Sequence, residues 1–111
     1  MISKGIYRNK KLLQLAEHSP CQWCQLPEGT GRVVACHVQS FRAQNFGKGT
    51  GIKPSDACTA FLCNDCHDLM DRRTSNPAMD SMSPIEHAEL WSYLILKTHE
   101  WIFTHHPEVL R

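Results

Sequence analysis

Several features that assign many proteins to a class are missing from this sequence. The 111 residues carry a formal net charge of only +1, so the chain as a whole has no electrostatic attraction to nucleic acid. Any such affinity must come from local clusters of Lys and Arg. The apolar run at residues 93–96 is far too short to span a membrane. Internal repeats, low-complexity segments and the glycine spacing of a Walker or dinucleotide-binding loop are also absent.

The N-terminal residues lack the apolar segment and the small-residue cleavage site of a secretory signal. We therefore expect a cytoplasmic, reducing compartment, where paired cysteines bind metal more often than they form disulfides. Of the six cysteines, Cys36 and Cys58 are expected to be small buried hydrophobes. The others form two Cys-x-x-Cys pairs, which together fill the tetrahedral shell of one zinc ion. The sequence thus predicts a structural Zn²⁺ site, with buried or redox-active thiols as the alternative, at Cys21, Cys24, Cys63 and Cys66.

The apolar and turn-forming residues predict an α+β chain. The best-marked element is the last helix, because Ser83 and Glu86 form a capping box around Pro84. The short helix before it is expected to start with Asn64 or Asp65 near its N-cap. We expect helices at about residues 7–17, 64–73 and 84–104, strands at 32–38 and within 57–62, and loops at 39–54 and 74–81. The stripe expected to pack on the core is Ile85, Ala88, Trp91, Ile95 and Ile102, widened by Leu94 and Trp101.

Two basic stretches could contact phosphate. The loop at 39–54 places Lys48 and Lys53 among glycines, a mixture that suits approach to a phosphate backbone, although a flexible insertion fits it as well. The first helix begins with Lys4, Arg8, Lys10 and Lys11, which indicate either a solvated helix or a phosphate-contacting arm.

The order of these parts predicts a ββα-metal unit built over a treble-clef zinc site. A nuclease of this kind needs a general base, and His37 at the end of the first strand suits that role near neutral pH. It also needs a hard cation to neutralise charge on the scissile phosphate. His67 and Asp71 lie four residues apart on the short helix, so both point to one face and could hold that cation. The catalytic residues expected are therefore His37, His67 and Asp71.

This arrangement resembles the HNH (His-Me finger) endonucleases and, more narrowly, the small YbcO-type nucleases of lambdoid prophages. The resemblance covers roughly residues 21–74. It is carried by Cys36-His37, by the run Gly-Thr-Gly-Ile-Lys-Pro-Ser-Asp at 49–56, by Cys-Asn-Asp-Cys-His-Asp at 63–68 and by Asp-Arg-Arg-Thr at 71–74. Cys36 stands where many such sites have a metal-binding aspartate. Asp56 is the nearest polar match for the central asparagine.

The length indicates one domain over 1–111, in which the resemblance covers the core at about 21–74 and the C-terminal helix is expected at about 84–104. The resemblance implies metal-dependent DNA cleavage in phage recombination or replication, with Mg²⁺, Mn²⁺ or Zn²⁺ as the catalytic metal. DNA is the expected partner, no membrane is involved, and a homo-oligomer is left open. The expected substrate contacts are Lys48, Lys53, Asp56, Arg72 and Arg73. The alternative is a non-catalytic treble-clef zinc module that binds nucleic acid or protein.

Overall fold

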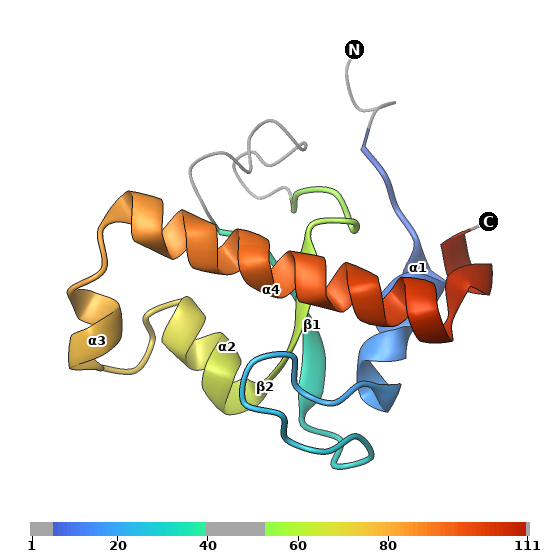
Figure 1. Cartoon of the computed structure of the whole chain (residues 1–111), viewed down its shortest axis with the longest axis horizontal. Helices are drawn as coiled ribbons and strands as arrows, with labels where there is room; N and C mark the ends of the chain where they lie inside the picture. The colour runs from blue at the N-terminus through green and yellow to red at the C-terminus, as the bar shows by residue number, and fades with distance from the viewer. Residues whose placement is uncertain (1–5, 40–52, 111) are drawn as a thin grey trace.

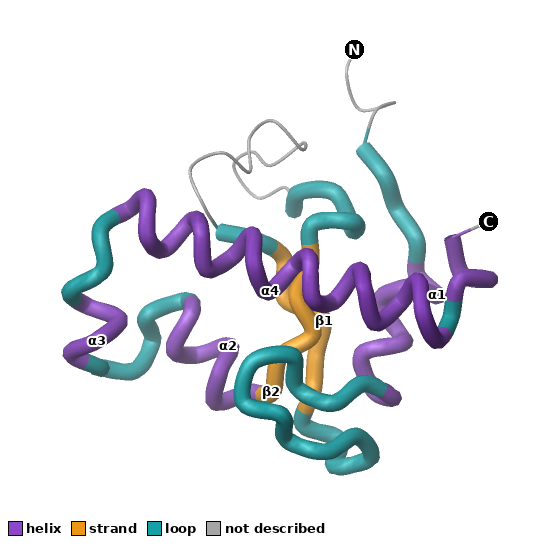
Figure 2. The backbone as a smooth tube through the Cα atoms, in the orientation of Figure 1, coloured by secondary structure: helices purple, strands orange, loops and turns teal. Residues whose placement is uncertain are grey.

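The centre of the chain is a two-stranded antiparallel sheet, seen in a computed structural model that describes residues 6–39 and 53–110 (Figures 1 and 2). Strand β1 is Val33–His37 and strand β2 is Thr59–Cys63. Val33 lies opposite Cys63, and His37 lies opposite Thr59. One end of the sheet therefore carries Cys63, and the opposite end carries His37. All of β2 is buried, whereas β1 is only partly buried.

The long helix α4, Pro84–His105, crosses the sheet (Figure 1). Its Thr98 is fully buried and meets β2 directly, because the Phe61 amide donates to Thr98 Oγ1 at 3.1 Å. The Thr98 hydroxyl in turn donates to the Leu94 carbonyl at 2.9 Å. A strand edge left unpaired would expose such amides to other chains. Helix α4 thus gives an acceptor to the Phe61 amide, which β1 does not pair.

Shorter helices surround this centre. In Figure 1, α2 and α3 lie toward one end of the molecule and α1 toward the other. Within the described ranges, no helix combines the length and apolar character needed to cross a bilayer. The remaining helices are α1 (Lys10–Gln14), which continues into a 3₁₀ turn (Leu15–His18), α2 (Asn64–Met70), α3 (Pro77–Asp80) and a final 3₁₀ turn (Pro107–Leu110).

The predicted α+β class is confirmed, and so is the capping box of α4, in which Ser83 and Glu86 bond each other's backbone amides. Three boundaries were predicted wrongly. Helix α1 starts at Lys10 rather than Tyr7, because the Asn9 side chain caps the Leu12 amide. Helix α2 begins at Asn64, as predicted, but ends at Met70 rather than at about Arg73. The expected loop at 74–81 contains helix α3, which Asn76 caps through the Met79 amide.

The packing face of α4 also differs at its start. The buried positions are Trp91, Leu94, Thr98 and Ile102. Continuing their three- and four-residue spacing backwards leads to His87 and Pro84, so Ile85 falls off this face. Ile85 is accordingly 81% exposed, and its predicted place in the core is wrong.

Candidate functional site

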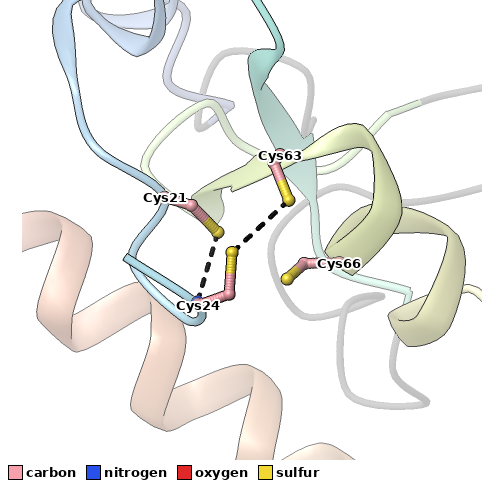
Figure 3. Close-up of side chains that lie close together, drawn as sticks. All are labelled: Cys21, Cys24, Cys63 and Cys66. Carbon is pink, nitrogen blue, oxygen red and sulfur yellow. Dashed lines mark hydrogen bonds between the residues drawn. The ribbon is translucent and has the colours of Figure 1, made fainter. Parts of the chain in front are cut away.

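Four cysteine sulfur atoms converge at the Cys63 end of the sheet (Figure 3). Cys21 and Cys24 come from the loop before β1, Cys63 ends β2 and Cys66 lies in the first turn of α2. Their Sγ atoms all lie within 4.8 Å of one another, and those of Cys24 and Cys63 are 3.7 Å apart. Tetrahedral zinc with Zn–S bonds of about 2.3 Å needs S–S separations of about 3.8 Å. The cluster can therefore hold a structural metal ion such as zinc, as predicted.

Backbone hydrogen bonds fold residues 21–26 into the tight turn, here called the knuckle, that presents Cys21 and Cys24. The Cys21 amide donates to the Leu26 carbonyl at 2.9 Å, and the Gln25 amide donates to the Cys21 carbonyl at 3.0 Å. The Gln22 amide donates to the Phe61 carbonyl at 2.9 Å, which fastens the knuckle to β2. Gln25 leaves the turn with a φ of 69°, in the left-handed region that favours glycine.

The thiols of the cluster differ in acidity. Burial alone would raise the pKa of Cys21, but amides of Cys63, Cys24 and Trp23 outweigh it and lower that pKa to about 7. Burial, with contacts to neighbouring thiols, raises the pKa of Cys66, and burial also raises that of Cys63. Metal ligation requires the thiolate, so binding must displace protons from these groups.

The two remaining cysteines lie apart from the cluster, as predicted. Cys36 and Cys58 are both buried. Burial, together with the negative charge of Asp71, raises the pKa of the Cys36 thiol to about 12. Cys36 is therefore a neutral thiol near pH 7, where the resemblance would place an ionised aspartate.

At the opposite end of the sheet, His37 is paired with Asp56. His37 Nε2 lies 2.9 Å from Asp56 Oδ1, and both side chains are more than nine-tenths buried. Asp56 Oδ2 accepts a hydrogen bond from the Asn9 amide at 2.8 Å. Both oxygens of Asp56 therefore already have partners within the chain. This placement favours an internal role for Asp56 over the substrate contact expected from the sequence.

On α2, His67 and Asp71 meet as their spacing predicts. His67 Nε2 lies 2.9 Å from Asp71 Oδ2, and Arg73 Nη2 lies 3.1 Å from the same oxygen. The second oxygen, Asp71 Oδ1, is buried, and no described residue donates a hydrogen bond to it. Buried polar atoms are rarely left without a partner, because the lost hydration is costly. Asp71 Oδ1 is thus a free acceptor with capacity for a cation or a donor.

A pocket of about 420 Å³ lies beside Asp71. Arg72 and Arg73, both exposed, give it positive charge. Arg72 closes α2 with a φ of 57° in a left-handed cap, and its side chain reaches the Met82 carbonyl at 3.4 Å. A pocket lined by two arginines and a carboxylate suits a ligand that combines a phosphate group with a cation. The lining residues are Gln39, Met70, Asp71, Arg72, Arg73 and His87.

The three expected catalytic residues lie in two separate pairs, His67 with Asp71 and His37 with Asp56, rather than in one cluster. Over residues 6–39 and 53–110, the four cysteines are the one group of three or more Cys, His, Asp or Glu whose ligand atoms converge enough for a metal. Lys53 is exposed, as a substrate contact would need, and its carbonyl accepts from Arg8 at 2.8 Å. The expected contact at Lys48 lies outside the described residues.

No protein-family model, curated protein or solved structure matches the chain. The cysteine cluster and the two His–Asp pairs are therefore interpreted from their own geometry.

The sequence does not indicate that four further residues lie around these pairs. Asn9 and Arg8 contact Asp56 across 47 and 48 residues, a separation that no spacing rule connects. Gln39 and His87 line the pocket from the end of β1 and from α4. The His87 ring contacts the Met70 carbonyl at 2.7 Å, so it also ties α4 to the end of α2. A long-range contact map, rather than a local motif, would be needed to find them.

Proposed function

We propose that the chain is a metal-dependent DNA endonuclease of the HNH type, built on a treble-clef zinc site. The order of its elements supports this reading. A cysteine knuckle comes first, and then a strand that ends at His37. A second strand leads into a helix whose first turn completes the cysteine cluster and whose later turns carry His67 and Asp71. The resemblance implies that the reaction serves phage recombination or replication.

The observation that carries the proposal is the hydrogen bonding of the Asp71 carboxylate. Its Oδ2 is shared between His67 and Arg73, while its buried Oδ1 has no donor among the described residues. A carboxylate oxygen beside a histidine is a suitable donor set for Mg²⁺, Mn²⁺ or Zn²⁺. His67 and Asp71 would hold such a cation at the edge of the pocket. When bound, the cation supplies positive charge at the scissile phosphate and the leaving oxygen.

The remaining roles fall to the chain's own side chains. His37 acts as general base and takes a proton from water through the ring nitrogen that Asp56 does not contact. The water oxygen forms a bond to phosphorus as the bond from phosphorus to the leaving sugar oxygen breaks. That oxygen takes a proton from solvent, which leaves a phosphate monoester and a free hydroxyl. Arg72, Arg73 and Lys53, together with Lys48, contact phosphates of the DNA without reading its sequence.

Nicking of supercoiled plasmid over a magnesium or manganese titration tests the proposal. The wild type should nick, and His67→Ala should lose activity that excess divalent metal partly restores, because a ligand rather than the base is missing. His18→Ala, at an exposed histidine outside the site, is the matched control and should nick like the wild type. A wild type that nicks equally well in chelator would contradict the proposal. A wild type that fails to nick with every metal tried would contradict it as well.

One observation favours a second function, a zinc module that binds nucleic acid and cleaves nothing. His37 and His67 are each already paired with a carboxylate inside the chain, and each pair alone provides too few ligands for a closed metal site. DNA binding by a zinc-loaded wild type that leaves plasmid intact under every metal would favour this module. Nicking that depends on His67 would exclude it.

A further inference from the structure

Asp56 lies between two segments that are distant in sequence. Its Oδ1 lies 2.9 Å from His37 Nε2, and its Oδ2 accepts from the Asn9 amide at 2.8 Å. Asp56 is only 5% exposed. Its carboxylate therefore links the end of β1 to the segment before α1 in a site that solvent scarcely reaches.

The segment Tyr7–Asn9 also fixes the backbone around Asp56. The Asp56 amide donates to the Tyr7 carbonyl at 2.9 Å. The Arg8 guanidinium donates to the carbonyls of Pro54 and Lys53 and lies 3.3 Å from Asp56 Oδ1. Arg8 is thus held by this network, which explains its position without a phosphate contact. The carboxylate has a defined orientation because both the backbone of Asp56 and its carboxylate oxygens are hydrogen-bonded.

This network determines which ring nitrogen of His37 carries a proton. Burial alone would raise the pKa of Asp56, but the hydrogen bonds from His37 and the Asn9 amide outweigh it and lower that pKa below its ordinary value. An ionised carboxylate can only accept hydrogen bonds. His37 Nε2 must then be the donor, and in a neutral ring the lone pair resides on Nδ1. No described residue hydrogen bonds to Nδ1.

We infer that Asp56, held by Tyr7–Asn9, is a positioning residue that keeps His37 in the Nε2–H tautomer with Nδ1 as its acceptor. The tautomer follows from the contacts and from the ionised carboxylate, and only its catalytic consequence rests on the proposed function. A base must present a lone pair to the proton it removes. The N-terminal segment, outside the metal-binding core, thereby becomes part of the machinery that sets the base.

The substitution Asp56→Asn tests this sharply because asparagine has one acceptor and one donor end. The Asn9 amide, at 2.8 Å, needs an acceptor at the Oδ2 position, so the new NH₂ group takes the Oδ1 position and faces His37 Nε2. The Arg8 guanidinium is the weaker partner of Oδ1 at 3.3 Å and keeps its two carbonyl acceptors when the NH₂ group replaces that oxygen. Nε2 must then accept, and the ring proton moves to Nδ1. A substitution that changes only one atom of the side chain is therefore expected to invert the tautomer of His37.

The measurement is ¹⁵N NMR of the His37 ring in zinc-loaded full-length protein, in mildly alkaline buffer where imidazole is neutral. The wild type should show the Nε2–H tautomer and Asp56→Asn the Nδ1–H tautomer. Asp80→Asn, at an exposed aspartate of α3, is the matched control and should keep the wild-type tautomer. An Nδ1–H tautomer in the wild type overturns the inference, and this result needs no variant to fold.

Plasmid nicking by the same samples separates this inference from the proposed function. If both hold, Asp56→Asn should lower kcat by about 10²–10⁴-fold, because the lone pair is on the wrong nitrogen, with KM for plasmid nearly unchanged. An inactive wild type with the Nε2–H tautomer would overturn the proposed function and uphold the positioning role. An unchanged tautomer in Asp56→Asn would overturn the positioning role whatever the activity.

Discussion

The two ends of the β1–β2 sheet carry opposite kinds of polar cluster. At the Cys63 end, four thiols converge around the space of one metal ion, and each half of the cluster is a pair three residues apart. At the His37 end, a buried carboxylate joins groups 19 to 48 residues apart through hydrogen bonds. Each half of the first cluster is local, the two halves come together across 39 residues, and a metal ion could complete the cluster. The second exists only once the whole chain has folded.

This difference predicts unequal consequences when each end is damaged. Loss of a cysteine leaves a metal site incomplete, and structural zinc contributes about 10–16 kcal/mol in small zinc domains. Loss of a single hydrogen-bonded side chain typically costs about 1–3 kcal/mol. The cysteine end should therefore decide whether the chain folds, while the histidine end should adjust its stability and chemistry.

The largest effect is expected for Cys66→Ser. The variant should lose its metal and its cooperative unfolding transition, because zinc binding and folding are coupled. The wild type should hold about one zinc per chain. Cys58→Ala, at a buried cysteine outside the cluster, should keep that zinc and remain folded. Metal analysis with far-UV circular dichroism makes the test, and a folded Cys66→Ser of wild-type stability would contradict it.

An intermediate effect is expected for Asp56→Asn, which should destabilise the zinc-loaded chain by about 1–3 kcal/mol. Because the pKa of Asp56 is lowered, its stabilisation is fully present above the ordinary aspartate pKa of about 3.9 and is lost as pH falls through the lower folded value. The steep pH dependence should instead come from the cysteines. Metal-bound thiols carry no protons, so at fixed free zinc the stability should rise between about pH 6 and 8.

Urea denaturation at several pH values checks this division. The wild type and Asp56→Asn should give nearly parallel curves of stability against pH, displaced by the cost of the substitution. A variant that loses the steep dependence would mean that the histidine end, not the cysteine end, sets the pH response.

The smallest effect is expected for Gln25→Gly in the knuckle. A residue other than glycine in the left-handed region costs roughly 1–2 kcal/mol, which the substitution relieves. Glycine also gives the unfolded chain more conformational freedom, and this offsets about 0.4–1 kcal/mol of the stabilisation. The net result should be a stabilisation of up to about 1 kcal/mol in urea with zinc saturating. Gln14→Gly, at an exposed helical position, should instead destabilise by about 0.5–1 kcal/mol. Equal destabilisation by both variants would contradict the strain assigned to Gln25.

Features with a local spacing were predictable from the sequence. Two Cys-x-x-Cys pairs indicated the cysteine cluster, and Ser83 with Glu86 indicated the start of α4. His67 and Asp71 lie 2.9 Å apart because residues four apart share one face of a helix. In each case the feature depends on residues within one helical turn of each other or on the ligand spacing of one metal ion.

Features that depend on tertiary contacts were not predictable. Asp56 has the charge of a surface residue, yet Asn9 and His37 bury it. Ile85 continues an apolar pattern, but the buried face of α4 is set by where the helix meets β2 at Thr98. The pocket beside Asp71 joins three segments, and no pattern in one segment reveals the others.

The central claim is that the cysteine end builds the chain and the histidine end carries its chemistry. The most direct measurement is plasmid nicking by His37→Gln, whose amide can still donate to Asp56 but cannot act as a base. At zinc content and urea midpoint matched to the wild type, its rate should fall about 10²–10⁴-fold, while His18→Gln should keep wild-type activity. Full nicking activity in His37→Gln under these conditions would contradict the account.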